Sequence, residues 1–178
     1  MNKALFLDRD GVVNVEKHYV HKPEDFEFIG GIFELCARFQ NEGFLIAVVT
    51  NQSGIARGFY GEAELVELNR WMVGKFSEQG VTVSGIYWCP HHPDYSGDCD
   101  CRKPKPGLLL RAGAELDLDL ANSVLLGDKE SDLDAGRAAG IRLVGLVHGH
   151  DRLESIDFEG IRGIDPDTLP AQLGDLAK

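Results

Sequence analysis

Short apolar runs alternate along the chain with segments whose apolar residues recur every three or four positions. The apolar runs lie at residues 4–7, 44–49, 81–88, 123–126 and 142–147, and each is typical of a buried strand. The spacing between them predicts helices from 32 to Gly43 and over 62–79, 107–116 and 132–139, with a final helix over 169–176. This alternation predicts an α/β fold with a Rossmann-like, doubly wound parallel sheet.

The length of the chain favours one compact unit. With 178 residues, 43% of them hydrophobic, we expect a single domain over residues 1–178. The loop of about twenty residues at 12–31 is too short for an inserted cap domain, so we expect no separate cap. Cys36 lies on the apolar face of the first predicted helix, where it is most simply a core residue.

Charge and hydropathy exclude several classes of partner. The net charge is −11 and no stripe of Lys or Arg is present, which excludes an electrostatic nucleic-acid surface. No segment has the apolar length of a signal peptide or a membrane span, so we expect a cytoplasmic protein without a membrane partner. The absence of a long exposed apolar helix or strand favours a monomer.

Polar motifs follow four of the predicted strands directly. Asp8, Thr50, Cys89 and Asp128 each stand at the carboxyl end of a strand, and in a parallel sheet these ends form one rim where ligands bind. Asp10 follows Asp8 after one residue. Two buried carboxylates this close resist joint ionisation, and a divalent cation would remove that cost. Taken alone, the pair could also be two surface aspartates in a solvated loop.

Paired carboxylates, a hydroxyl, a lysine and a third acidic site on one rim suit phosphoryl transfer through an aspartyl-phosphate. The chain resembles the phosphatases of the haloacid dehalogenase (HAD) superfamily in D-R-D-G at 8–11, the strand into Thr50, Arg102-Lys103, and G-D-K at 127–129 with Asp132. More narrowly, it resembles the D-glycero-D-manno-heptose 1,7-bisphosphate phosphatases. That resemblance runs over about 5–147, and it rests on T-N-Q-S-G-I-A-R-G at 50–58, C-P-H-H-P at 89–93 and C-D-C-R-K-P at 99–104.

The resemblance implies a role for each motif residue. Asp8 is the nucleophile and Asp10 the general acid and base. A magnesium ion is held by Asp8, the backbone carbonyl of Asp10 and Asp128. Thr50 donates to a phosphate oxygen, and Lys103 neutralises the nucleophile and the transferred group.

A further set of residues is expected to bind the substrate: Glu16, Lys17, His18, Tyr19, Asn51, Gln52, Ser53, Arg102 and Lys129. Arg102 suits the distal groups of the substrate because a guanidinium binds phosphate in a bidentate manner. The three residues 51–53 could instead only shape the turn, and Lys129 could orient Asp128. Asp132 is expected to organise its loop or to cap a helix. The family often has Thr at the position of Val12, which puts at most one substrate contact in doubt.

The loop at about 89–101 is rich in Cys and His. Cys89, His91, Cys99 and Cys101 supply three thiolates and one imidazole, a set that suits tetrahedral zinc. Because all four positions are filled by protein, the zinc is expected to be structural and to fix the loop that delivers the basic pair 102–103. A disulfide is the alternative. His92 rivals His91 as a ligand, and the C-x-H spacing of the family favours His91.

The implied activity is a magnesium-dependent phosphatase that removes the 7-phosphate from a heptose bisphosphate, a phosphorylated sugar used to make nucleotide-activated heptose for lipopolysaccharide and other surface polysaccharides. A histidinol-phosphate phosphatase is the close alternative, because that branch shares the zinc loop. A receiver-like signalling domain also has acidic residues, a hydroxyl and a lysine, but Asp10 and the zinc loop argue against it. His148 and His150 follow the fifth strand and are expected to be surface or packing residues.

Overall fold

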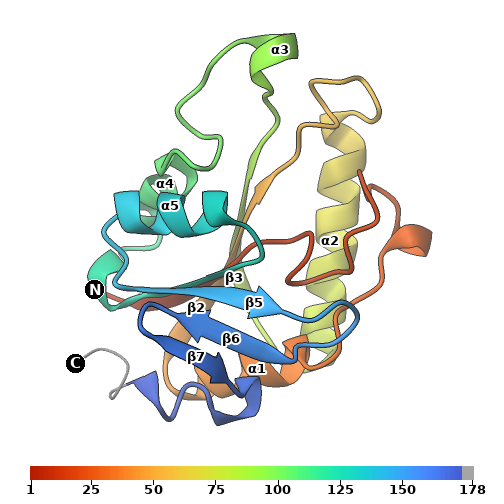
Figure 1. The fold of residues 1–178 in the computed structure, drawn as a ribbon. Helices are drawn as coiled ribbons and strands as arrows, with labels where there is room; N and C mark the ends of the chain where they lie inside the picture. Colours follow the sequence, from red (N-terminus) through yellow and green to blue (C-terminus); the bar gives the residue numbers. More distant parts are fainter. Residues whose placement is uncertain (174–178) are drawn as a thin grey trace.

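A seven-stranded sheet forms the centre of the computed structural model, which describes residues 1–173 (Figure 1). The strands are β1 (Lys3–Leu7), β2 (Phe44–Asn51), β3 (Val83–Cys89), β4 (Val124–Gly127), β5 (Leu143–His148), β6 (Ser155–Phe158) and β7 (Ile161–Ile164). Their order is β3-β2-β1-β4-β5-β6-β7, and β1 lies between β2 and β4. The first five strands are parallel, whereas β6 and β7 add to β5 as an antiparallel pair.

Helices cover both faces of this sheet. They are α1 (Ile32–Asn41), α2 (Glu62–Glu78), α3 (Pro93–Ser96), α4 (Gly107–Glu115) and α5 (Glu130–Ala138), with 3₁₀ turns at Pro23–Asp25, Leu120–Asn122 and Pro166–Thr168. Apolar residues of α1 and α2 pack with Leu5 and Leu7 on one face, while those of α4 and α5 pack with Ala4 and Phe6 on the other. Successive residues of a strand point to opposite faces, so β1 supplies both cores.

The predicted doubly wound fold is therefore confirmed in its five parallel strands and four long helices. Each predicted boundary lies within two residues of the observed one. Cys36 is fully buried, as predicted, and both His148 and His150 are exposed. No helix among residues 1–173 combines the length and the apolar character needed to cross a bilayer.

The C-terminal part of the chain differs from the prediction. The hairpin of β6 and β7 was not predicted, because each strand has only four residues and β7 buries none of them fully. Residues 169–172 form turns rather than the start of the predicted helix over 169–176. Leu169 is extended and fully buried, and the proline that follows it disfavours a helical conformation there. The rest of that predicted helix, from 174 on, lies outside the described residues.

Candidate active site

The sequence motifs meet at the carboxyl ends of β1, β2 and β4, where two glycines allow close contact. Gly11 has a φ of +93°, a conformation that favours glycine, and a Cβ at this position would collide with the carboxylate of Asp128. A Cβ on Gly127 would likewise collide with the side chain of Asp132. Gly11 therefore lets the two loops touch, and Gly127 lets Asp132 fold back against the end of its own strand.

Three carboxylates and one lysine form the centre of the site. Oxygen atoms of Asp8, Asp128 and Asp132 lie within 4.8 Å of one another. Lys103 Nζ lies 2.7 Å from Asp8 Oδ1 and 2.6 Å from Asp132 Oδ1. Asp132 also caps α5, because its Oδ2 accepts a hydrogen bond from the backbone N–H of Lys129 at 3.1 Å. Both roles predicted for Asp132, in the loop and at the helix, are thus present.

The cluster holds three carboxylates and one lysine, and burial makes this excess of negative charge costly. Burial raises the pKa of Asp8 to about 7, and Lys103 only partly opposes the shift. Burial also raises the pKa of Asp128, against the charge of Lys129. Asp128 Oδ1 is buried and has no hydrogen-bond partner among the described residues. Carboxylate oxygens with unmatched charge and an unpartnered atom fit a hard divalent cation such as magnesium.

The side-chain amide of Asn51, the last residue of β2, holds Lys103 in place. Asn51 Nδ2 donates to the carbonyl of Lys103, and the backbone N–H of Lys103 donates to Asn51 Oδ1, both at 3.1 Å. Lys103 Nζ also donates to the carbonyl of Val49 at 2.9 Å. Burial alone would lower the pKa of Lys103, but the charges of the two aspartates outweigh it and raise this pKa. Asn51, predicted to bind substrate or to shape the turn, thus positions the lysine.

Asp10 lies beside the cluster in a separate hydrogen-bond network. Its Oδ2 accepts from Gln52 Nε2 at 2.9 Å, and the same nitrogen donates to Thr50 Oγ1 at 2.9 Å. The hydroxyl of Tyr60 donates to Gln52 Oε1 at 2.5 Å. Gln52 is only 2% exposed, so it links the predicted phosphate-binding hydroxyl to the predicted proton donor.

A cavity of about 520 Å³ opens over these groups. Its lining includes most of the residues predicted to bind substrate: Glu16, His18, Tyr19, Asn51, Gln52, Ser53, Arg102 and Lys129. Lys17 is absent from this lining, and its Nζ lies 2.9 Å from Glu27 Oε2. Tyr60, Pro104 and Ser131 also line the cavity and were not predicted. Ser131 stands two residues after Lys129, in the first turn of α5, so its proximity to G-D-K was the one signal for it.

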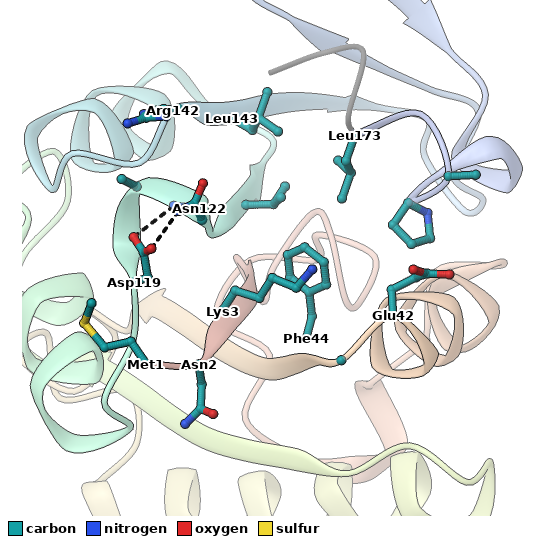
Figure 2. A pocket seen from close by; sticks show the side chains of 15 residues that line it. Met1, Asn2, Lys3, Glu42, Phe44, Asp119, Asn122, Arg142, Leu143 and Leu173 are labelled. Carbon is teal, nitrogen blue, oxygen red and sulfur yellow. Dashed lines mark hydrogen bonds between the residues drawn. The ribbon is translucent and has the colours of Figure 1, made fainter. Parts of the chain in front are cut away.

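A larger cavity, of about 730 Å³, lies at the opposite end of the sheet (Figure 2). Lys3, Phe44, Val124 and Leu143, which line it, are the first residues of four strands. The predicted motifs stand at the other ends of these strands. The 520 Å³ cavity is therefore the candidate active site.

The four predicted zinc ligands come together in one cluster. The sulfur atoms of Cys89, Cys99 and Cys101 lie 3.0–3.6 Å apart, and His91 Nδ1 lies 3.3 Å from Cys101 Sγ. All three are free thiols, so the alternative of a disulfide is not formed. A tetrahedron with Zn–S bonds of about 2.3 Å has edges of about 3.8 Å, so the cluster is close to the size of a zinc site.

His92, the rival ligand, faces away from this cluster. Its Nε2 lies 3.1 Å from Arg57 Nη2, and its Nδ1 accepts from the backbone N–H of Asp94 at 3.2 Å. The cluster runs from Cys89, the last residue of β3, to Cys101 ahead of α4, and Arg102 and Lys103 follow it directly. A metal in the cluster would therefore fix the start of the segment that brings both cations to the rim.

Comparisons with known proteins agree with this geometry. The family model for HAD-hydrolase-like proteins matches residues 100–176. A D-glycero-beta-D-manno-heptose-1,7-bisphosphate 7-phosphatase of Vibrio cholerae is 52% identical over 143 residues, 78% of this chain and 77% of the relative. The D-glycero-alpha-D-manno-heptose-1,7-bisphosphate 7-phosphatase of Campylobacter jejuni is 51% identical over 146 residues, 82% of this chain and 83% of the relative.

A solved structure extends the similarity over nearly the whole chain. The D,D-heptose 1,7-bisphosphate phosphatase from B. bronchiseptica, complexed with magnesium and phosphate, superposes with a TM-score of 0.77 at 32% identity. The match covers 98% of this chain and 99% of that one. The solved relative shares the fold, and the two curated relatives are about half identical to this chain over 78% and 82% of its length. The chain therefore belongs to the D-glycero-D-manno-heptose-1,7-bisphosphate 7-phosphatase family of HAD-like hydrolases.

Proposed function

We propose that this protein hydrolyses the 7-phosphate of D-glycero-D-manno-heptose 1,7-bisphosphate through an aspartyl-phosphate, as a step in the synthesis of nucleotide-activated heptose. The observation that carries the proposal is the placement of Asp8, Asp10 and Lys103 on one rim beneath a cavity, in a chain about half identical to named heptose bisphosphate phosphatases. Most of the residues that line the cavity are polar or charged, which suits a sugar phosphate.

Two aspartates divide the chemistry in this proposal. A carboxylate oxygen of Asp8 attacks the phosphorus, and the bond from phosphorus to the sugar oxygen breaks while Asp10 gives that oxygen a proton. Asp10 then takes a proton from water, which attacks the phosphorus of the aspartyl-phosphate. The bond from phosphorus to Asp8 breaks, inorganic phosphate leaves, and both carboxylates return to their first state.

Fixed cations and donors assist both steps. Lys103 Nζ, 2.7 Å from Asp8, offsets the charge that gathers on the attacking carboxylate and the transferred group. Thr50 Oγ1 is oriented by Gln52 and donates to a phosphate oxygen. Asp8, the backbone carbonyl of Asp10 and Asp128 would hold magnesium, which would supply the Lewis-acid stabilisation that lets an anionic nucleophile approach an anionic phosphate.

The walls of the cavity would select the substrate. Arg102 is fixed by a hydrogen bond from Nη1 to the carbonyl of His91 at 3.2 Å, which leaves its other nitrogen atoms for the distal groups of the substrate. Lys129 Nζ lies 3.6 Å from Glu16 Oε2 and 3.7 Å from Asp128 Oδ2, so it also fits a role in orienting Asp128. Lys17, which pairs with Glu27, would reach the substrate only by leaving that partner.

The Cys and His cluster would hold a structural zinc. Three sulfur atoms and one imidazole nitrogen fill a tetrahedral site and leave no position for a substrate or an activated water. We further propose that residues 1–178 form one domain, with the zinc loop at about 89–101 in place of a cap, and that the protein acts as a monomer in the cytoplasm. Free thiols in the cluster are in keeping with a reducing compartment.

The proposal predicts a clear order of substrates. With magnesium present, kcat/KM for one anomer of heptose 1,7-bisphosphate should exceed that for histidinol phosphate by at least about 10²-fold, because the polar cavity has donors for a second phosphate. Initial rates of phosphate release from both anomers and from histidinol phosphate measure this. A preference for histidinol phosphate would preserve the mechanism and overturn the proposed substrate. A phosphorylated protein that does not turn over would point to the receiver-like alternative.

A further inference from the structure

Arg9 stands between the two aspartates of D-R-D-G and is fully buried. It is the largest side chain among the fully buried ones of the described residues. A buried guanidinium is costly unless it has an anionic partner and hydrogen-bond acceptors. The anion in contact with it is Asp10, whose Oδ1 lies 2.9 Å from Arg9 Nη2. A charged group enclosed this completely beside the reacting centre calls for a functional explanation.

The same nitrogen also reaches the loop that lines the cavity. Arg9 Nη2 donates to the carbonyl of Val20 at 2.7 Å, and the guanidinium lies over the ring of Phe26, 5.9 Å from its centroid. Val20 follows Tyr19, the last residue of the segment 16–19 predicted to bind substrate. One nitrogen atom therefore joins the carboxylate of Asp10 to the loop whose preceding residues line the cavity.

The two oxygens of Asp10 have different surroundings. Oδ1 accepts hydrogen bonds from Arg9 at 2.9 Å and from Asn14 Nδ2 at 3.0 Å, whereas Oδ2 accepts one from Gln52. A carboxylate oxygen offers two lone pairs, so both lone pairs of Oδ1 are in use and one of Oδ2 remains. Oδ2 is therefore the oxygen that can exchange a proton.

We infer that Arg9 is a positioning residue, which turns Asp10 so that Oδ2 faces the leaving oxygen and ties this carboxylate to the substrate loop at Val20. The inference rests on the proposed function, in which Asp10 is the acid and base. Each reacting carboxylate then has its own buried cation, Lys103 for Asp8 and Arg9 for Asp10. Removal of Arg9 should misplace the proton donor and leave the nucleophile in position.

The role of Arg9 can be tested with two substrates whose leaving groups differ in their need for a proton. A sugar alkoxide is a poor leaving group and needs the proton from Asp10, whereas nitrophenolate leaves readily without one. A misplaced proton donor therefore slows the cleavage of a sugar phosphate more than that of p-nitrophenyl phosphate. Partial unfolding would slow both reactions by the same factor.

The experiment compares the Arg9→Met protein with the wild type on both substrates. Single-turnover release of heptose 1-phosphate from heptose 1,7-bisphosphate should fall by about 10²-fold or more, and release of nitrophenolate by less than about 10-fold. Val13→Ala is the matched control, since Val13 is equally buried in the same loop and has no polar side chain to contact Asp10. It should lower both rates by one common factor.

Two further variants keep the test decisive. Arg9→Lys retains the charge but cannot place a donor where Nη2 lies, so it should show the same selective loss at smaller size. It takes the place of Arg9→Met where that protein does not fold. Adding Arg9→Met to Asp10→Asn should change the rate by less than about 2-fold, because residues that act through each other are not additive. Equal losses on both substrates, or full additivity, would overturn the role of Arg9.

Failure of the proposed function looks different in the same assay. In that case the wild-type protein does not cleave the heptose bisphosphate at all. The comparison is then repeated with the best alkyl phosphate ester found, against p-nitrophenyl phosphate. A selective loss on the alkyl ester would support the role of Arg9, and an equal loss on both esters would contradict it.

Discussion

The Asp8→Asn protein should lose at least about 10⁴-fold in phosphatase kcat and remain folded. An amide cannot attack the phosphorus as a carboxylate does, and no other carboxylate among the described residues takes the place of Asp8 directly after β1. Asp132 remains to pair with Lys103, at 2.6 Å, so the lysine keeps an anionic partner. The loss should therefore arise from the missing nucleophile and the missing charged ligand for magnesium, not from a displaced Lys103.

Stability provides an independent check on this variant. Asp8, Asp128 and Asp132 crowd one buried site, and burial raises the pKa of Asp8 to about 7. Removing one of three crowded carboxylates should leave the melting temperature without magnesium unchanged or higher. Thermal unfolding and steady-state turnover measure the two effects. Asp134→Asn, at an exposed position of α5, is the control and should keep full activity. Substantial activity in Asp8→Asn would contradict the mechanism.

The Cys99→Ser protein should lose its zinc and about 10²-fold or more in kcat. A hydroxyl is a poor zinc ligand, and the loop from Cys89 to Cys101 has little regular structure apart from the single turn of α3. Lys103 and Arg102 follow the last ligand directly, so an unfixed loop places both cations poorly. Cys89 belongs to the buried core of the sheet, but Cys99 is only partly buried beside that core, so replacing Cys99 alone should leave the sheet folded.

Metal content and turnover, measured on the same samples, test this prediction. The wild type should carry one zinc per chain and Cys99→Ser much less than one. Cys36→Ala is the matched control, because Cys36 is a buried cysteine in α1 outside the cluster. It should keep its zinc. Full activity in a zinc-free Cys99→Ser protein would mean that the loop does not depend on the metal.

The placement of the motifs could be predicted because it depends on strand ends alone. Apolar runs located the ends of β1, β2 and β4, and a parallel sheet then brings Asp8, Thr50 and Asp128 to one rim. The spacing of Cys and His was equally direct, since the loop is short enough for local sequence to define the cluster. The first inference needs the topology and the second only local spacing, and neither needs side-chain detail.

The supporting contacts could not be predicted, because they join residues that are distant in sequence. Asn51 pairs with the backbone of Lys103, 52 positions away, and the amide alone does not reveal this partner. Arginine is a charged residue that usually lies at the surface, yet Arg9 is fully buried. A buried charged side chain such as Arg9 departs from the usual burial of residue types, and such departures are expected at functional sites.

The central claim is that this protein removes the phosphate at position 7 of a heptose bisphosphate, and phosphorus NMR of the reaction tests it directly. On incubation of D-glycero-D-manno-heptose 1,7-bisphosphate with the protein and magnesium, the 7-phosphate signal should disappear as inorganic phosphate forms. The signal of the 1-phosphate should remain. Loss of the 1-phosphate, or an unchanged spectrum for both anomers, would contradict the claim.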